Sequence, residues 1–480
     1  MTQRDRNQDT GPADRPVSDG LSAGGSPKDA APADTPQTLN AALLDAILAA
    51  VEQGAAGRLA VLLGPLHAAD IADLLEQIGS GSREQLVQLW GDALDPETLS
   101  ELSDGLLRDI VPLLSARQLA RLTELETDDV VSIVEELDAR QQEKVLETLS
   151  EADRAAVVSS LAYPEFSAGR LMQRELVTAP NHWTVGEIID FMRAAEHLPD
   201  VFYDVVLVDP RIRPIGAVPL SRIMGNRRAM ALLDLTHADF RTIHPEATQE
   251  DVAYDFAQYH MMSLPVVDEG GRLVGVITAD DAMIAQGEEA EEDIKRLAGV
   301  GDEALTDRFW ATARQRFPWL SANLCTAMLS ALVISTFEDA LQAIVALAVL
   351  MPVVASMGGN AGTQTLTVAV RALATRDLTA ANMRRIVGRE ALVGLFNGLA
   401  FALLLAAIAG VWFGSAGLAA VLAMAMVVNL LVAGLAGILI PVGLDRLGAD
   451  PALASGTFVT TMTDVVGFFT FLGLASLVLL

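Results

Sequence analysis

The last 29 residues of the chain, ALASGTFVTTMTDVVGFFTFLGLASLVLL, are apolar enough to cross a bilayer and hold one charged side chain. A membrane-spanning helix needs about 20 predominantly apolar residues, and four earlier segments meet the same criterion. Hydrocarbon offers the backbone no hydrogen-bond partners, so a segment of this length is expected to be helical. The sequence therefore predicts an all-helical membrane domain with five spans, at about 317–337, 341–370, 390–413, 416–442 and 452–478.

Basic residues between the spans predict the orientation. They precede the first span and separate the second from the third and the fourth from the fifth, whereas the other two turns have none. Cytosolic loops concentrate basic residues, and the N-terminus has no apolar secretory signal. We expect a multi-pass protein of the cell (inner or plasma) membrane with a cytosolic N-terminus and an outside C-terminus. The arginines are Arg308, Arg314, Arg316, Arg371, Arg376, Arg384, Arg385, Arg389 and Arg446.

The charged side chain in the last span is Asp464, and a carboxylate at that depth costs at least ~2.5–3.5 kcal/mol. It could pair with a basic residue, relay protons or bind a permeating cation. The span cores hold no Lys or Arg and the spans no His, which favours cation binding; a hydrogen-bonded structural Asp is the alternative. Oxygen ligands suit hard cations such as Mg²⁺ or Ca²⁺. Further donors are expected from Thr460, Thr461, Thr463 and Asn429.

The second predicted span contains MPVVASMGGNAGTQT, which is rich in helix-weakening and polar residues. Irregular backbone at membrane depth is tolerated where it is buried in protein or lines a wet cavity. This pattern favours a pore wall with Asn360 as a candidate ion-site residue. Close helix packing through small residues is the alternative.

The soluble part is strongly acidic. The chain has 33 basic and 62 acidic residues; residues 301–480 hold nine and ten of them, so residues 1–300 hold 24 and 52. This balance argues against a nucleic-acid partner. The single cysteine, Cys325, excludes a disulfide framework. Residues 1–38 have the composition of a disordered tail, and 39–171 show short helical periodicities that predict a superhelical α-helical domain.

An internal duplication follows the helical region. VLVDPRIRPIGAVPLSRIM (Val206–Met224) matches PVVDEGGRLVGVITADDAM (Pro265–Met283) at an offset of 59 residues, and a helical pattern precedes each hairpin-like segment. The duplicated region, 172–286, resembles a tandem pair of α/β CBS domains. The resemblance implies a module that binds adenine nucleotides or metals, or dimerises, so ATP is a candidate ligand.

Five of the six residues from Glu288 to Asp293 are acidic. They stand at the start of a predicted helix over 287–316 that would connect the duplicated region to the first span. Acidic residues in a first turn favour the helix dipole, so capping and solvation are the alternative to a binding role.

Four stretches together resemble the MgtE family of magnesium channels, along nearly the whole chain after residue 39. They are YPEFSAGRLM, LVGVITADDAM with EEAEEDIKRLAGV, MPVVASMGGNAGTQT, and LGADPALASGTFVTTMTDVVGFF. The resemblance implies a homodimer in the bilayer with one central pore, in which Asp464 recognises hydrated Mg²⁺. It implies Mg²⁺ uptake driven by the electrochemical gradient, and no enzyme activity.

The resemblance also implies a gate. The acidic connecting helix would be a plug at the cytosolic mouth, and Mg²⁺ bound at acidic interfaces would close the pore. The residues that it implies are Asp128, Asp129, Glu250, Asp281, Glu289, Glu292, Asp293 and Asp450. Two other functions stay open from the residues alone: a broader divalent channel that passes Co²⁺ or Mn²⁺, and a membrane-anchored CBS sensor.

Overall fold

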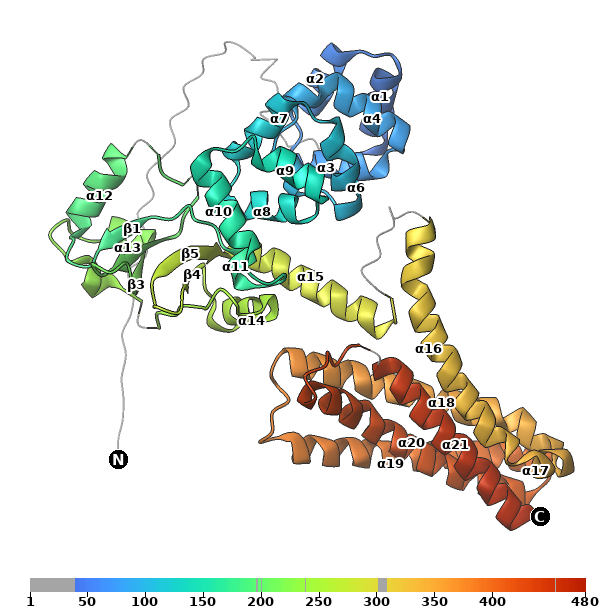
Figure 1. The fold of residues 1–480 in the computed structure, drawn as a ribbon. Coiled ribbons are helices and arrows are strands. Elements are labelled where there is room, and N and C mark those ends of the chain that lie inside the picture. The colour runs from blue at the N-terminus through green and yellow to red at the C-terminus, as the bar shows by residue number, and fades with distance from the viewer. Residues whose placement is uncertain (1–38, 196, 200, 238, 301–308, 454) are drawn as a thin grey trace, which may run out of the picture.

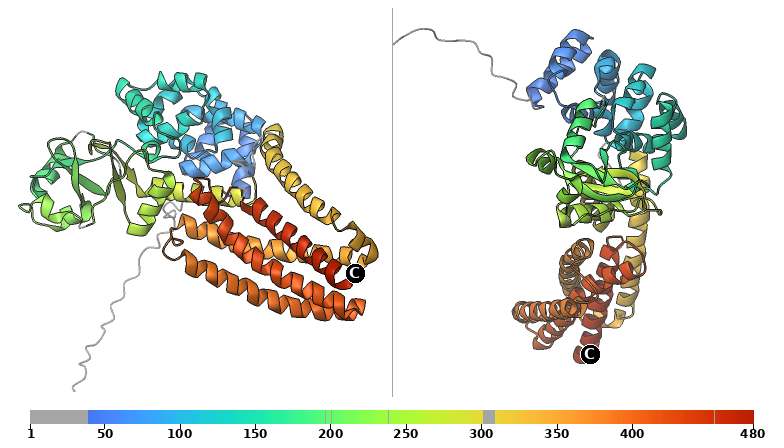
Figure 2. Two further views of the ribbon diagram at one scale, coloured as in Figure 1. Left: turned by 60° about the horizontal axis from the view of Figure 1, so that its bottom comes forward. Right: turned by 90° about the vertical axis from the view of Figure 1, so that its left-hand side faces the viewer.

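The computed structural model describes residues 39–195, 197–199, 201–237, 239–300, 309–453 and 455–480. The tail predicted over 1–38 lies outside the described residues. The rest is a mostly helical chain with two small sheets and a separate bundle of long helices (Figure 1). From the side, the helical domain, the sheet-containing units and the long helices follow one another in that order (Figure 2). The predicted fold class, a multidomain membrane protein, is confirmed.

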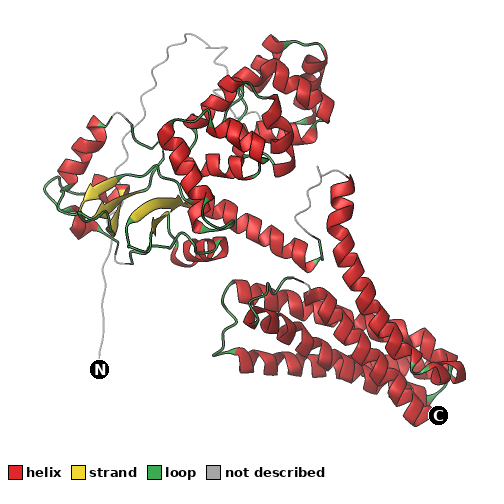
Figure 3. Cartoon of the chain, in the orientation of Figure 1, coloured by secondary structure: helices red, strands yellow, loops and turns green. Residues whose placement is uncertain are grey.

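The first part of the described chain is a stack of short helices around a leucine-rich core (Figure 3). Local signals start several of them: Ser115 with Gln118, and Asp138 with Gln141, form reciprocal capping boxes. The helices are α1 (Ala41–Glu52), α2 (Ala56–Leu63), α3 (Ala68–Gln77), α4 (Ser80–Trp90), α5 (Glu97–Ser100), α6 (Asp104–Ile110), α7 (Ala116–Ala120), α8 (Thr127–Glu135), α9 (Ala139–Leu146), α10 (Glu151–Leu161) and α11 (Ala168–Leu171), with 3-10 turns at Gly91–Ala93, Val111–Leu113 and Arg121–Glu124.

The duplicated segments form two antiparallel hairpins, β2–β3 and β4–β5. Each hairpin has a register irregularity, between Leu207 and Val208 in the first and between Val266 and Val267 in the second. These positions are again 59 residues apart, so the duplication extends to backbone detail. The elements are β1 (Thr178–Pro180), α12 (Val185–Ala194), β2 (Asp204–Val208), β3 (Pro214–Pro219), α13 (Leu220–Gly225), a 3-10 turn (Leu232–Leu235), α14 (Gln249–Tyr259), β4 (Ser263–Val267) and β5 (Leu273–Thr278).

The acidic helix α15 (Ala279–Leu297) follows β5 directly and points from the second hairpin toward the long helices (Figure 1). It ends before Gly299, whose φ is +70°, a left-handed conformation that commonly terminates helices. The single connecting helix predicted over 287–316 is therefore wrong in extent: α15 begins earlier and stops short of Val300, and a separate helix begins at Phe309.

Within the described part of the chain, five helices are long and apolar enough to cross a membrane, and their number agrees with the sequence prediction. The chain is thus a membrane protein with candidate spans within α16, α18, α19, α20 and α21. Among these, α20 is the most enclosed and contacts α18, α19 and α21. The bounds are α16 (Phe309–Ser335), α17 (Glu338–Ala343), α18 (Val345–Ala374), α19 (Met383–Phe413), α20 (Ala416–Arg446) and α21 (Ser455–Leu479).

The glycine-rich second span lies in one continuous helix, α18, as the predicted all-helical membrane domain requires. Its glycines allow close helix contact. A Cβ at Gly358 would lie 2.3 Å from Nδ2 of Asn429, and one at Gly362 would lie 2.5 Å from Cγ1 of Val459. A helix satisfies its own backbone in the membrane, and small residues let neighbouring helices approach.

Candidate ion pathway and cation-binding sites

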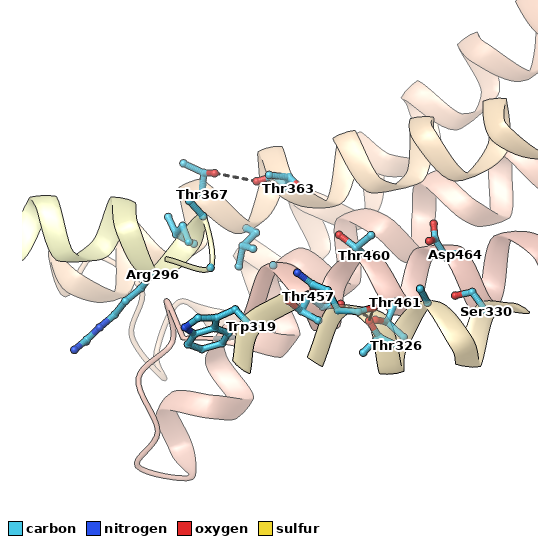
Figure 4. Close-up of a pocket in the computed structure, with 17 residues that line it drawn as sticks. Arg296, Trp319, Thr326, Ser330, Thr363, Thr367, Thr457, Thr460, Thr461 and Asp464 are labelled. Atoms are coloured by element: carbon cyan, nitrogen blue, oxygen red, sulfur yellow. Dashed lines mark hydrogen bonds between the residues drawn. The ribbon is translucent and has the colours of Figure 1, made fainter. Parts of the chain in front are cut away.

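A cavity of about 440 Å³ lies between α16, α18 and α21, and the C-terminal end of α15 reaches its mouth (Figure 4). Polar groups dominate the labelled lining, although the helices that carry them are apolar. Among the described residues that line it, Asp464 supplies the only carboxylate. The labelled residues are Arg296, Trp319, Thr326, Ser330, Thr363, Thr367, Thr457, Thr460, Thr461 and Asp464.

The Asp464 side chain is half-buried at one end of this cavity. Within the described ranges, no side chain or backbone group hydrogen-bonds or ion-pairs with it. A structural Asp at membrane depth would be expected to accept hydrogen bonds from its neighbours, because an unpaired buried acceptor is costly. The geometry therefore favours a carboxylate that is available to a mobile cation or to its water shell.

The oxygen donors expected around Asp464 divide into two groups. Thr460 and Thr461 line the cavity. Thr463 and Asn429 are fully buried between helices instead. Thr463 Oγ1 donates to the carbonyl of Thr460 at 2.9 Å, and Asn429 Nδ2 donates to the carbonyl of Val354 at 2.8 Å. The Asn429 bond joins α20 to α18, whereas the Thr463 bond stays within α21, and both side chains lie outside the cavity lining.

Asn360 is exposed on α18 and does not line the cavity. The first span supplies polar groups that the sequence analysis missed: Asn323, Thr326 and Ser330. Asn323 Oδ1 accepts a hydrogen bond from Thr457 Oγ1 at 2.8 Å, which joins α16 to α21. Their spacing of three and four residues puts the three on one helix face. A polar stripe at this spacing inside an apolar span was the signal that could have found them.

A second cavity, of about 570 Å³, lies where α14, α15, the end of α18 and the loop before α21 meet. Burial raises the pKa of Glu289 to about 7, and the neighbouring Glu250 and Asp293 carboxylates add to the shift. Burial and the Asp450 carboxylate likewise raise the pKa of Asp293. Five acids implied by the family resemblance line this cavity, which we call the acidic cavity: Glu250, Glu289, Glu292, Asp293 and Asp450.

Arginines connect the acidic cavity to the membrane helices. Arg296, near the end of α15, forms ion pairs with Glu292 and with Asp450. Arg376, after α18, forms an ion pair with Asp251 of α14, and its guanidinium carbon lies 4.3 Å from the centre of the Tyr254 ring. The soluble part thus docks onto the arginine-bearing ends of the spans.

A third cavity, of about 470 Å³, lies between the helical domain and α15. It brings together Asp128, Asp129 and Asp281, and the Asp128 and Asp281 carboxyl groups are in hydrogen-bonding contact. Burial and the nearby Asp281 raise the pKa of Asp128 well above its usual range and that of Asp129 to about 6. Two carboxyl groups in contact need a shared proton or a cation between them.

The cleft between the two duplicated units is small, about 20 Å³. Asp204 and Ser263, which are 59 residues apart, meet there: Ser263 Oγ donates to Asp204 Oδ2 at 2.6 Å. Small-molecule sites typically measure about 300–1,000 Å³. The cleft in this conformation would have to open for an adenine nucleotide, so ATP binding stays a prediction.

Three family models match the chain. "Divalent cation transporter" matches residues 351–474, "MgtE intracellular N domain" matches 66–166, and "CBS domain" matches 233–288. The magnesium transporter MgtE of Thermus thermophilus is 32% identical over 440 residues, which cover 90% of this chain and 97% of that protein. The magnesium transporter MgtE of Bacillus subtilis is 30% identical over 74% of this chain and 79% of its own length.

Among solved structures, the cytosolic domain of the Mg²⁺ channel MgtE in complex with ATP matches 50% of this chain and 99% of its own, with 27% identity and a TM-score of 0.47. Five apolar helices and the matched membrane domain define a membrane protein of the divalent cation transporter class. The relatives that align along most of the chain narrow this class further. The chain belongs to the MgtE family.

Proposed function

We propose that this protein is a Mg²⁺ channel whose ion pathway passes through the cavity at Asp464. The observation that carries the proposal is a carboxylate without a protein partner among the described residues, in a cavity lined by hydroxyl groups. Mg²⁺ gives up its waters reluctantly. A single carboxylate per chain with surrounding hydroxyls suits an ion that arrives with much of its water shell.

A gradient is sufficient to drive uptake. A divalent ion gains roughly 4.6 kcal/mol per 100 mV of inside-negative potential, and the sequence has no G-x-x-x-x-G-K-[ST] nucleotide-hydrolysis motif. The arginine-bearing span ends contact the acidic soluble part through the Arg376–Asp251 ion pair. This contact supports a cytosolic location for that whole side, with the C-terminus outside.

Cytosolic Mg²⁺ closes the channel in this proposal. The acidic cavity and the third cavity each join elements from different domains through carboxylates that repel one another. A bound divalent cation would replace this repulsion with attraction and favour the compact arrangement, which is a shift of population toward the closed state. High internal Mg²⁺ would thereby limit its own entry.

We further propose a homodimer with a central pore, in which two Asp464 carboxylates balance the charge of one divalent ion. Leu324 and Leu332 on the outer surface of α16 are more than 60% exposed. This apolar surface suits contact with a second copy of the chain or with lipid. A broader divalent channel remains the alternative function, since the matching family model is described by divalent cations in general.

The test is Mg²⁺ flux into liposomes with wild-type protein, Asp464→Asn and Asp339→Asn, matched for amount and folding. Asp339 is an exposed acid in α17, the short helix after the first span, and serves as the charge-matched control. Removing a charged ion contact should lower flux on the order of 100-fold, with the control unchanged. Undiminished flux in Asp464→Asn would refute the pathway, and competition by Co²⁺ or Mn²⁺ would favour the broader channel.

A further inference from the structure

The first span encloses a serine and leaves its leucines on the outside. Of the side chains of α16 whose burial the structure describes, Ser330 is the sole buried one, at 6% exposure. The large apolar residues of the same helix point outward, and Leu324 and Leu332 are 64% and 63% exposed. Exposed leucines suit contact with lipid or with a partner helix, so the feature of this helix that calls for an explanation is the enclosed serine.

The Ser330 hydroxyl has no protein partner among the described residues. This is unusual for its helix, since Ser321 Oγ donates to the carbonyl of Phe317 at 2.8 Å and Ser335 Oγ donates to that of Leu332 at 2.7 Å. Thr326 Oγ1 likewise donates to the carbonyl of Asn323 at 2.9 Å. A buried hydroxyl that forgoes this local bond is costly unless another partner is present.

Ser330 lies where a ligand in the cavity could be its partner. Its side chain lines the cavity at the same end as Asp464, across from it (Figure 4). A hydroxyl oxygen accepts hydrogen bonds, and the water molecules around a divalent cation are strong donors. A carboxylate on one wall and a hydroxyl acceptor on another can therefore hold one water shell from two sides.

We propose that Ser330 accepts a hydrogen bond from the water shell of the hydrated divalent cation held at Asp464, and so helps to set the affinity of the ion pathway. This inference rests on the proposed function and extends the ion site to the first span. It assigns the first span a role in binding, beyond that of an anchor.

The experiment measures Mg²⁺ flux into liposomes against Mg²⁺ concentration for wild type, Ser330→Ala, Ser330→Thr and the matched control Ser335→Ala. Loss of one neutral hydrogen bond should raise the half-maximal Mg²⁺ concentration of Ser330→Ala about two- to tenfold. Ser330→Thr keeps the hydroxyl and should stay near wild type, as should Ser335→Ala.

Thermal unfolding of the same proteins distinguishes binding from structure. Ser330→Ala loses no described protein contact of the hydroxyl, so it should unfold at the wild-type temperature or above. A lower unfolding temperature, or a half-maximal concentration equal to that of Ser335→Ala, would overturn the inference. If wild type carries flux and Asp464→Asn does not, such a result refutes the role of Ser330 alone. No flux in wild type would refute the proposed function itself.

Discussion

The membrane cavity and the acidic cavity both collect oxygen ligands, but they do so in opposite ways. In the membrane cavity, Asp464 stands as one carboxylate among hydroxyl groups. In the acidic cavity, burial and the neighbouring carboxylates together raise the pKa values of Glu289 and Asp293. A site with one charge can bind and release an ion readily. Neighbouring carboxylates instead repel one another and destabilise the fold until a cation or a proton neutralises them.

We infer from this difference that the membrane cavity conducts the ion and that the acidic cavity senses it. Ions must leave a conducting site quickly, so binding there has to stay weak. A sensing site must instead convert ion binding into a change of conformation, which requires a large difference in affinity between two states. Repulsion among the carboxylates of the acidic cavity supplies such a difference.

The largest predicted effect, a loss of inhibition by internal Mg²⁺, comes from removing the soluble part from the membrane helices. Removal of residues 1–300 deletes most of the acidic cavity and leaves the spans and Asp464. We expect Mg²⁺ flux to persist while inhibition by internal Mg²⁺ is lost, measured by flux into liposomes preloaded with Mg²⁺. Full inhibition in the truncated protein would show that the spans themselves sense the ion.

A smaller effect is expected from Glu289→Gln with Asp293→Asn in the full chain. Loss of two carboxylates should raise the internal Mg²⁺ concentration needed for closure by about tenfold, a coupling of ordinary size. The control is Glu291→Gln on the same helix, because Glu291 faces outward and pairs with Lys295 at 2.8 Å. Equal shifts in both proteins would mean that overall charge, and not the cavity, sets the response.

The membrane cavity depends on close packing, which Gly358→Ala should disturb. The new methyl group would meet Asn429 Nδ2 at 2.3 Å, whereas Gly359, its neighbour, faces open space. We expect Gly358→Ala to destabilise the protein by about 1–3 kcal/mol and Gly359→Ala to be neutral or slightly stabilising. Thermal unfolding in detergent checks this, and identical unfolding temperatures would contradict the packing that the structure shows.

The smallest effect concerns pH. The Glu289 pKa of about 7 lies above the usual 4.5, so between these values the folded protein keeps a proton that the unfolded chain has released. The contribution of Glu289 to stability therefore falls as pH rises from 4.5 to 7. Without Mg²⁺, we expect the unfolding temperature to drop by about 2–4 °C from pH 5 to pH 8, and less in Glu289→Gln. A slope unchanged by the substitution would exclude Glu289 as a source.

Local patterns determined much of this fold. Apolar length fixed the number of spans, since the hydrocarbon thickness sets the length of a helix that crosses it. The 59-residue offset predicted two equivalent hairpins, and the structure shows that the two also share a register irregularity at the equivalent position. Asp464 stood out because a lone charge in an apolar run is rare. Each of these signals can be read along the sequence without knowing which segments pack together in space.

Other features depended on which helices meet. Asp128 and Asp281 touch across 153 residues of chain, and Ser330 faces Asp464 only because α16 lies along α21. Gly299 marks the end of α15 in the sequence. The role of the glycines in α18 could not be predicted in the same way, because they pack closely against α20 and α21, which are distant in the chain. The sequence by itself determined the spans, the repeat and the lone carboxylate. Only the tertiary structure decided which polar groups share a cavity, since that depends on the rotation and contact of helices distant in the chain.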